Sequence, residues 1–226
     1  MKRSTRLVSI KNTPMVIFEG PECISDDIVK YNNFWEFEIF NKFKKHFPTK
    51  GLMLDIGANI GSHCLQFKHH FPEIEIWSFE PFYENFDVLK TNTDRYNDVH
   101  CFNVGVGSNN SMVHFGNEQE KNSGVIKIVP KSNITNLVIA LDTITFPKPI
   151  SFIKIDVEGH EISAFEGMKD LLLRDKPVIW LEDNKHTAVP YLETLGYELI
   201  DKETNNVVFE HHYNAENKRV YIHFES

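Results

Sequence analysis

Apolar positions along the chain follow two different spacings, and the spacing changes several times. Between Asp26 and Phe47 the apolar side chains recur every three or four residues, which predicts an amphipathic helix or a pair of helices that ends at Pro48. Beyond this point, short apolar runs of strand length alternate with segments of helical spacing. The predicted strands are 51–57, 73–81, 99–107, 150–159 and 177–183, and the predicted helices are 59–71, 83–96, 161–176 and 187–196.

This alternation predicts an α/β fold. Strands that alternate with crossover helices form a mostly parallel sheet with helices packed on both of its faces. The predicted strands are nearly continuous in apolar residues, as expected for parallel strands that are buried on both sides.

Two segments depart from the alternation. Residues 112–144 contain extended pieces without a helix, which we interpret as antiparallel strands and loops inserted after the third parallel strand. Residues 205–212 and 218–225 are predicted to pair as antiparallel strands at the C-terminal edge of the sheet. No linker divides the chain, so we expect one domain over 1–226, with an N-terminal helical cap segment in 1–50 and a core in 51–226.

Composition narrows the possible partners. The 226 residues suffice to bury a sizeable core, and the net charge of −8 weighs against a nucleic-acid partner.

No apolar run approaches the length of a membrane span, and the N-terminus lacks the apolar core of a signal peptide, so we expect a cytoplasmic protein. The three cysteines are scattered and show no metal or disulfide spacing. A small-molecule or glycan substrate is expected, while the oligomeric state stays open.

The loop after the first predicted strand has the character of a nucleotide site. Gly57 permits a tight turn and Gly61 permits close packing where the next helix starts, although the spacing is not the G-x-G-x-x-G of dinucleotide folds. Asp55 suits an ammonium group better than a pyrophosphate, and Glu80 at the end of the next strand can accept hydrogen bonds from ribose hydroxyls. With Asn103 at the third strand end, these residues favour S-adenosylmethionine (SAM) over NAD, unless the three polar strand ends are unrelated.

Five stretches together resemble the FkbM family of SAM-dependent methyltransferases. They are LDIGANIGSH, FEPFYENFDVLKTN, NVGVGS, ALDTI and FIKIDVEGHEISAFEGM, in the order and spacing of that family over roughly residues 35–196. The resemblance implies a class I methyltransferase (Rossmann-like) fold and O-methylation, often of sugars in glycans or glycosylated metabolites.

The resemblance also implies which residues contact SAM. The first loop would surround its methionine part, the second strand end would hold the ribose, and the third would flank the adenine. In that order, the expected contacts are Asp55, Gly57, Ala58, Asn59, Gly61 and Ser62; Glu80 and Pro81; and Asn103 and Val104.

The end of the fourth strand carries candidate catalytic groups. In an open α/β sheet the acceptor should lie over the fourth and fifth strands, where Asp156, Glu158 and His160 follow one another. A sugar hydroxyl is a poor nucleophile until a base or a metal draws off its proton. His160, with an ordinary pKa near 6.5, is the first choice of base and Glu158 the second, and the alternative for His160 is a helix-start residue without a chemical role. Lys154 either points into the site or pairs with an acid.

A magnesium site is a further hypothesis. Asp156 and the acids after the fifth strand resemble the ligands of metal-dependent O-methyltransferases, and such oxygen ligands suit Mg²⁺. The proposed ligands are Asp156, Glu182 and Asp183, with Asn184 as a substitute. The alternative is that these acids bind sugar hydroxyls directly.

These observations predict a SAM-dependent O-methyltransferase that acts on a sugar hydroxyl. A non-sugar metabolite or RNA ribose is the alternative acceptor, and the acidic balance of the chain weighs against RNA. A SAM-binding domain without catalysis is the alternative from another class. Trp35 and Glu36 precede the first strand and either cover the cofactor or belong to a helix core.

Overall fold

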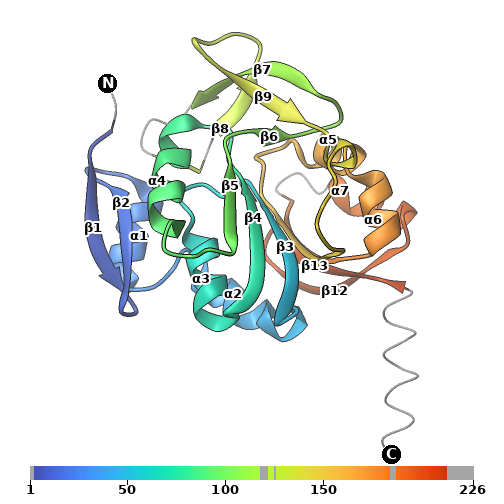
Figure 1. The fold of residues 1–226 in the computed structure, drawn as a ribbon, viewed down its shortest axis with the longest axis horizontal. Helices are drawn as coiled ribbons and strands as arrows, with labels where there is room; N and C mark the ends of the chain where they lie inside the picture. The colour runs from blue at the N-terminus through green and yellow to red at the C-terminus, as the bar shows by residue number, and fades with distance from the viewer. Residues whose placement is uncertain (1–2, 118–121, 125, 184–186, 213–226) are drawn as a thin grey trace, which may run out of the picture.

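The structure is a computed structural model that describes residues 3–117, 122–124, 126–183 and 187–212. Its centre is a seven-stranded sheet of order β12-β13-β11-β10-β3-β4-β5, in which β11, β10, β3, β4 and β5 are parallel and β12 and β13 are antiparallel (Figure 1). The bounds are β3 Lys50–Ile56, β4 Glu73–Phe79, β5 Val99–Phe102, β10 Ile150–Ile155, β11 Val178–Glu182, β12 Tyr197–Glu203 and β13 Asn206–His211. The mostly parallel sheet with an antiparallel edge is therefore confirmed.

The antiparallel edge is built differently from the expectation. β13 lies between β11 and β12, with Phe209 opposite both Ile179 and Leu199, so β12 is its outer partner. The expected partner, residues 218–225, lies outside the described residues. β12 was not predicted, because it is an edge strand. Most of its residues are exposed, and few of its side chains are apolar.

Helices cover both faces of the sheet. On one face lie α2 (Phe37–Phe43), α3 (Ser62–His70) and α4 (Tyr83–Thr93), and on the other lie α5 (Glu161–Glu166), α6 (Lys169–Asp175) and α7 (Ala188–Thr194). The single helix predicted over 161–176 is two helices, because the chain turns at Gly167. A Cβ on Gly167 would lie 1.8 Å from the carbonyl oxygen of Gly107, so only glycine allows this close approach.

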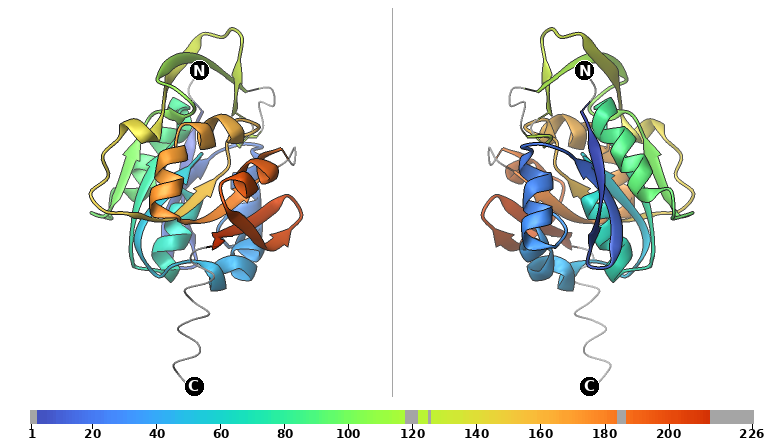
Figure 2. Two further views of the ribbon diagram at one scale, coloured as in Figure 1. Left: turned by 90° about the vertical axis from the view of Figure 1, so that its right-hand side faces the viewer. Right: turned by 90° about the vertical axis from the view of Figure 1, so that its left-hand side faces the viewer.

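The prediction that residues 1–50 form a helical segment is wrong for the first part of that segment. Residues 5–18 form a hairpin of β1 (Thr5–Ile10) and β2 (Thr13–Phe18), followed by α1 (Cys23–Tyr31), α2 and a 3₁₀ turn, η1 (Lys44–His46). The hairpin turns at Lys11 and Asn12, both with positive φ, a pair that lacks the usual Asn-Gly signal. It runs along the outside of the core beside α4 (Figure 2), where the Asn92 side chain accepts from the N–H of Val16 at 2.6 Å.

The inserted strands form a small sheet of their own. Its order is β6-β9-β7-β8, with β6 (Gly105–Val106), β7 (Ser111–Asn117), β8 (Ile126–Val129) and β9 (Ile134–Ile139), followed by the 3₁₀ turn η2 (Leu141–Thr143). Figure 1 shows this sheet beyond the end of the central sheet where β5 leads into β6. The insertion therefore closes one side of the crevice at the carboxyl ends of the strands.

No helix in the described part of the chain has the length and apolar character needed to cross a membrane.

Candidate active site

The site lies where the central sheet changes direction. β3 connects onward to β4 on one side, while β10 occupies its other side, which is the switch point where ligands bind in open α/β sheets. The loops after β3 and β10 touch there: a Cβ on Gly57 would lie 1.7 Å from the carbonyl oxygen of Asp156, and the N–H of Asp156 donates to the Ile56 carbonyl at 3.0 Å. Gly57 is therefore required for the two loops to meet.

The loop after β3 is fixed to the end of β4. The N–H groups of Gly57 and Ala58 donate to the carbonyl oxygen of Phe79 at 2.9 and 3.1 Å. Asn59 adopts a positive φ of 50° and donates its N–H to Glu80 Oε2 at 2.8 Å. These contacts hold the loop open around the crevice before any ligand enters.

Glu80 is a buried carboxylate at the centre of this loop pair. Its side chain accepts from the N–H groups of Asn59 and Phe82, both at 2.8 Å, and the residue is only 4% exposed. Burial raises the pKa of Glu80 to about 7, although the two backbone donors oppose the rise. A carboxylate held in this way is suited to accept further hydrogen bonds from ribose hydroxyls.

A first pocket of about 610 Å³ opens beside Glu80. Its wall combines apolar side chains from β4, β6 and the inserted sheet with a few polar groups. The lining residues are Ile56, Gly57, Asn59, Phe79, Glu80, Pro81, Asn85, Gly105, Val106, Phe115, Ser123, Gly124, Ile128, Val138, Asp156, Val157, Glu158 and His160. An apolar wall next to a buried carboxylate fits a nucleoside.

A second pocket of about 660 Å³ adjoins the first and is more polar. The two share Gly57, Asn59, Gly124, Asp156 and Glu158. The second pocket is otherwise lined by Ile24, Trp35, Glu36, Ala58, Ile60, Ser62, His63, Asn122, Lys154 and Glu182. A ligand with an apolar nucleoside end and a charged tail can therefore extend from one pocket into the other.

Lys154 is a buried cation in the wall of the second pocket. Its Nζ lies 3.3 Å from Asp156 Oδ2, and its side chain is only 3% exposed. Burial opposes the charge, but Asp156, Asp55 and the neighbouring glutamates outweigh it and hold the pKa of Lys154 well above its usual value. Lys154 thus both lines the pocket and pairs with an acid.

Glu158 lies on the boundary of the two pockets in an unusual backbone conformation. Its φ of 52° is left-handed, which costs a non-glycine residue of order 1–3 kcal/mol and tends to occur at functional sites. Burial and the nearby Asp156 raise the pKa of Glu158 to about 7. Asp156 and Glu158 thus line the same two pockets.

His160 does not join them on the second pocket. It is the N-cap residue of α5 and lines only the first pocket, where a Cβ on Gly107 would lie 3.1 Å from its Nε2. Burial lowers the pKa of His160. Among the described residues, His160 therefore lies in the wall of the first pocket and not beside Lys154 and Glu182 in the second.

The expected magnesium ligands do not converge. Asp183 is fully buried and caps α7: its Oδ1 accepts from the N–H of Thr187 at 3.2 Å, and its Oδ2 accepts from Ala188 at 3.0 Å and Val189 at 3.3 Å. Asp156 and Glu182 do line the second pocket, where burial and Asp156 raise the pKa of Glu182 to about 8. The ammonium of Lys154 contacts Asp156 there.

The donor set therefore does not fit Mg²⁺. Across the residues that the structure describes, no group of three or more His, Cys, Asp or Glu side chains is arranged to hold a metal ion. The substitute ligand, Asn184, lies outside the described residues.

Three of the expected cofactor residues lie behind the pocket rather than in its wall. Asp55 is fully buried and accepts from Cys64 Sγ at 3.2 Å, on the side of the sheet covered by α3. Asn103 donates its amide to the carbonyl oxygens of Glu80 and Pro81 at 2.8 and 3.2 Å, and so positions that loop. Val104 packs against the core, and Gly105 and Val106 form the wall instead.

The remaining expected cofactor residues lie close to the pockets. Ala58, Asn59 and Ser62 line the second pocket, Pro81 lines the first, and Gly61 forms the turn before α3 with a φ of 82°.

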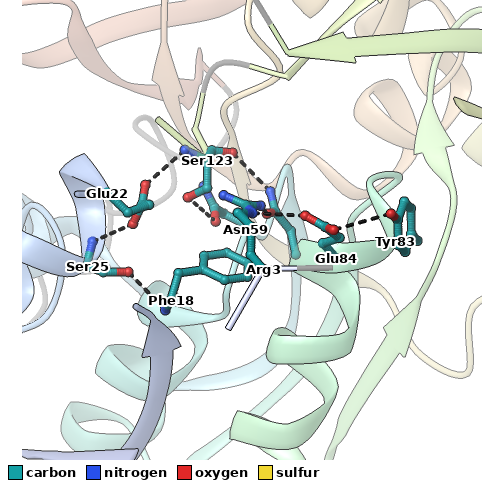
Figure 3. A network of polar contacts seen from close by, with 9 residues as sticks. Arg3, Phe18, Glu22, Ser25, Asn59, Tyr83, Glu84 and Ser123 are labelled. Carbon is teal, nitrogen blue, oxygen red and sulfur yellow. Dashed lines mark hydrogen bonds and ion pairs between the residues drawn. The ribbon is translucent and has the colours of Figure 1, made fainter. Parts of the chain in front are cut away.

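Sequence reasoning missed a polar network that joins four distant segments beside the first pocket. Ser123 donates its N–H to Glu22 at 2.9 Å and its hydroxyl to the Asn59 side chain at 3.3 Å, while Asn85 donates to the Ser123 carbonyl at 3.0 Å (Figure 3). Glu22 at the same time caps α1. A lone serine in a polar stretch gives no sequence signal for contacts over such separations.

The sheet order, the glycine turn after β3 and the adjoining pockets define a class I methyltransferase fold. The chain belongs to the FkbM methyltransferase family, because the family model "Methyltransferase FkbM domain" matches residues 55–224. The expected family and fold class are thereby confirmed.

Three individual relatives are between 20% and 29% identical to this chain. The chain is 29% identical over 126 residues to "Hexuronic acid methyltransferase AglP" of Haloferax volcanii, covering 54% of this chain and 51% of AglP. It is 25% identical over 183 residues to "Methyltransferase 1" of Beauveria bassiana, covering 67% and 74% of the two chains. The crystal structure of Methyltransferase FkbM from Methylobacillus flagellatus KT superimposes with a TM-score of 0.58 and 20% identity, covering 73% of this chain and 44% of that one. The chain thus spans about half of AglP and less than half of that solved structure.

Proposed function

We propose that this methyltransferase transfers the methyl group of SAM to a hydroxyl group of a sugar. Two observations support the proposal: a largely apolar pocket beside the buried Glu80 adjoins a more polar second pocket, and one relative is named a hexuronic acid methyltransferase. Because that relative is matched over half of its length, its name indicates a class of acceptor and not the acceptor itself.

In this proposal the first pocket holds the nucleoside of SAM and the loop after β3 holds its methionine part. Glu80 receives the ribose hydroxyls, and the apolar wall of Phe79, Val106 and Val138 packs on the adenine. SAM, when bound, supplies a methyl group on a sulfonium that is ready for displacement. The residues of the chain must then position the acceptor and take up the proton of its hydroxyl.

The observation that carries the mechanism is the position of Glu158. Its side chain lines both pockets, so it lies beside the cofactor and the acceptor, and its pKa of about 7 suits a base at neutral pH. Glu158 accepts the hydroxyl proton in this proposal. Asp156, held by Lys154 at 3.3 Å, orients a neighbouring hydroxyl. His160 acts as a wall residue, and no metal ion takes part.

The first test is calorimetric titration with S-adenosylhomocysteine (SAH), with NADH as the control ligand. We expect micromolar binding of SAH and no binding of NADH, followed by methyl transfer to a sugar hydroxyl when SAM and a sugar panel are supplied. Binding of NADH alone would contradict the cofactor assignment. SAH binding without transfer to any hydroxyl compound would favour a binding domain without catalysis.

A further inference from the structure

A third cavity, of about 680 Å³, lies on the surface between α1 and α2. We call it the α1–α2 groove. Its lining residues are Asp27, Ile28, Tyr31, Phe34, Trp35, Glu36, Phe37, Glu38 and Ile39. Trp35 and Glu36 also line the second pocket, so the proposed acceptor site and the groove share one wall.

The shared wall is held in place from several sides. The N–H of Trp35 donates to Ser62 Oγ at 2.8 Å, which ties the wall to the start of α3. Glu36 Oε1 accepts from the Asn206 side chain at 3.3 Å, and Glu36 Oε2 lies 3.4 Å from His63 Nε2. Because α3 and β13 fix this wall, a ligand that extends from the second pocket into the adjoining groove passes over a pre-organised surface.

The groove has the chemistry of a site for a sugar ring. Tyr31 is 53% exposed, and its ring centroid lies 6.4 Å from that of Phe37. Aromatic faces bury the apolar C–H face of a ligand, while a tyrosine hydroxyl and nearby carboxylates can bond to its polar edge. Asp27 and the exposed Glu38 supply such acceptors in the lining of the groove.

The charge of the groove limits what it can hold. The three carboxylates that line it, from Asp27, Glu36 and Glu38, outnumber the ammonium of Lys30, which lies 4.6 Å from the centroid of the Tyr31 ring. Like charges in contact oppose binding, so a phosphate or pyrophosphate group would be disfavoured here. The occupant therefore has hydroxyl groups and no negative charge.

We propose that the α1–α2 groove binds a neutral sugar unit attached to the sugar that is methylated. The acceptor is then a glycan or glycosylated metabolite, and not a nucleotide-sugar. This inference rests on the proposed function, because it takes the second pocket as the site of the methylated sugar.

The test compares acceptors that share the methylated sugar. Glucose, cellobiose and UDP-glucose form one set, and the matching galactose and mannose compounds form two more. In the set whose members are methylated fastest, we expect the disaccharide to have a KM about fivefold or more below that of the monosaccharide. One aromatic contact would give an effect of this size. The nucleotide-sugar should be no better than the monosaccharide.

Variants then locate the effect in the groove. Tyr31→Ala should remove the advantage of the disaccharide and leave the KM of the monosaccharide unchanged, and Tyr31→Phe should retain most of it. Leu199→Ala, at an exposed position on β12, is the matched control and should change neither value. Unaltered SAH binding in all three variants would show that they are folded.

Two results would overturn the inference while the proposed function stands. One is a disaccharide advantage that survives Tyr31→Ala, and the other is a nucleotide-sugar that is the best acceptor. Transfer to no member of any set and to none of the matching hexuronic acids, with SAH binding intact, would remove sugar methylation itself and the groove assignment with it.

Discussion

At the scale of single residues, the strand-end acids were the most predictable part of the site. Glu80, Asp156 and Glu158 follow apolar runs directly, and the carboxyl ends of parallel strands meet at one edge of the sheet. The sequence does not reveal which group each polar side chain forms its hydrogen bonds with. Asn103 bonds two backbone carbonyls and Asp183 bonds three backbone N–H groups, because local backbone groups compete with any ligand.

Glu158 is the residue on which the proposed chemistry depends. Glu158→Gln removes the base while keeping the size of the side chain, so we expect kcat to fall by about 10²–10⁴-fold with SAH binding retained. In the wild type, a base with a pKa of about 7 must lose its proton to act, so turnover should rise with pH through neutrality. Initial rates between pH 5.5 and 8.5 measure this, and the variant should lose that rise.

Two variants complete the experiment on the base. Glu193→Gln, on the exposed side of α7, is the matched control and should turn over at the wild-type rate. His160→Ala should keep most of the kcat at saturating SAM, since His160 lines the first pocket and not the second. A collapse of kcat in His160→Ala together with an active Glu158→Gln would move the base to the histidine.

At the scale of helices and strands, the apolar pattern predicted the buried elements and missed the exposed ones. The parallel strands are apolar because both of their faces are buried, so their spacing is visible in the sequence. The β1–β2 hairpin and β12 are exposed along one side or edge, so polar residues dilute their alternation. The break between α5 and α6 depends on contact with the Gly107 carbonyl, which no local pattern records.

The cap of α7 gives a prediction at this scale. Asp183→Ala leaves three N–H groups at the start of the helix without their acceptor, so we expect the free energy of unfolding to fall by about 1–2 kcal/mol. Urea unfolding followed by circular dichroism measures the change, and Glu193→Ala on the same helix serves as the control. A stability equal to that of the wild type would contradict the capping role.

A chelation experiment separates this cap from the magnesium hypothesis. Because the oxygens of Asp183 bond the backbone and Lys154 contacts Asp156, we expect turnover to be unchanged after exhaustive treatment with EDTA. Loss of turnover that added Mg²⁺ restores would show that the acids of the second pocket bind a metal after all.

At the scale of the whole molecule, the site depends on segments that are far apart in the sequence. The hairpin and α1 carry Glu22, the loop after β3 carries Asn59, and the insertion carries Ser123, and the three meet beside the first pocket (Figure 3). The class of fold could be predicted from the order of the elements. The closure of the crevice could not, because it depends on how the N-terminal hairpin and the inserted sheet pack on the core.

The assembled site also brings together several acids, and burial opposes their ionisation. The stability of the folded protein therefore depends on pH. Glu80 and Glu158 have pKa values of about 7, and Glu182 of about 8, against an ordinary value of 4.5. Between pH 6.5 and about 8 the unfolded chain holds almost no proton on these groups, whereas the folded chain is still releasing the protons that it holds. Stability therefore decreases as pH rises through this window, being fully present only below about pH 4.5.

The histidines with lowered pKa values do not reverse this decrease in stability above about pH 7.5. The pKa values of His70, His160 and His211 are lowered from the ordinary 6.5, so these groups oppose the trend slightly near pH 6.5 and are neutral in both states above about pH 7.5. Thermal unfolding without ligand should show the melting temperature falling from pH 6.5 to 8.5. The fall should be smaller in Glu182→Gln, which removes the group with the highest of these values, and unchanged in Glu193→Gln. A melting temperature that rises across this window would mean that the acids are ionised in the folded protein, and the second pocket would then hold more positive charge than the described residues provide.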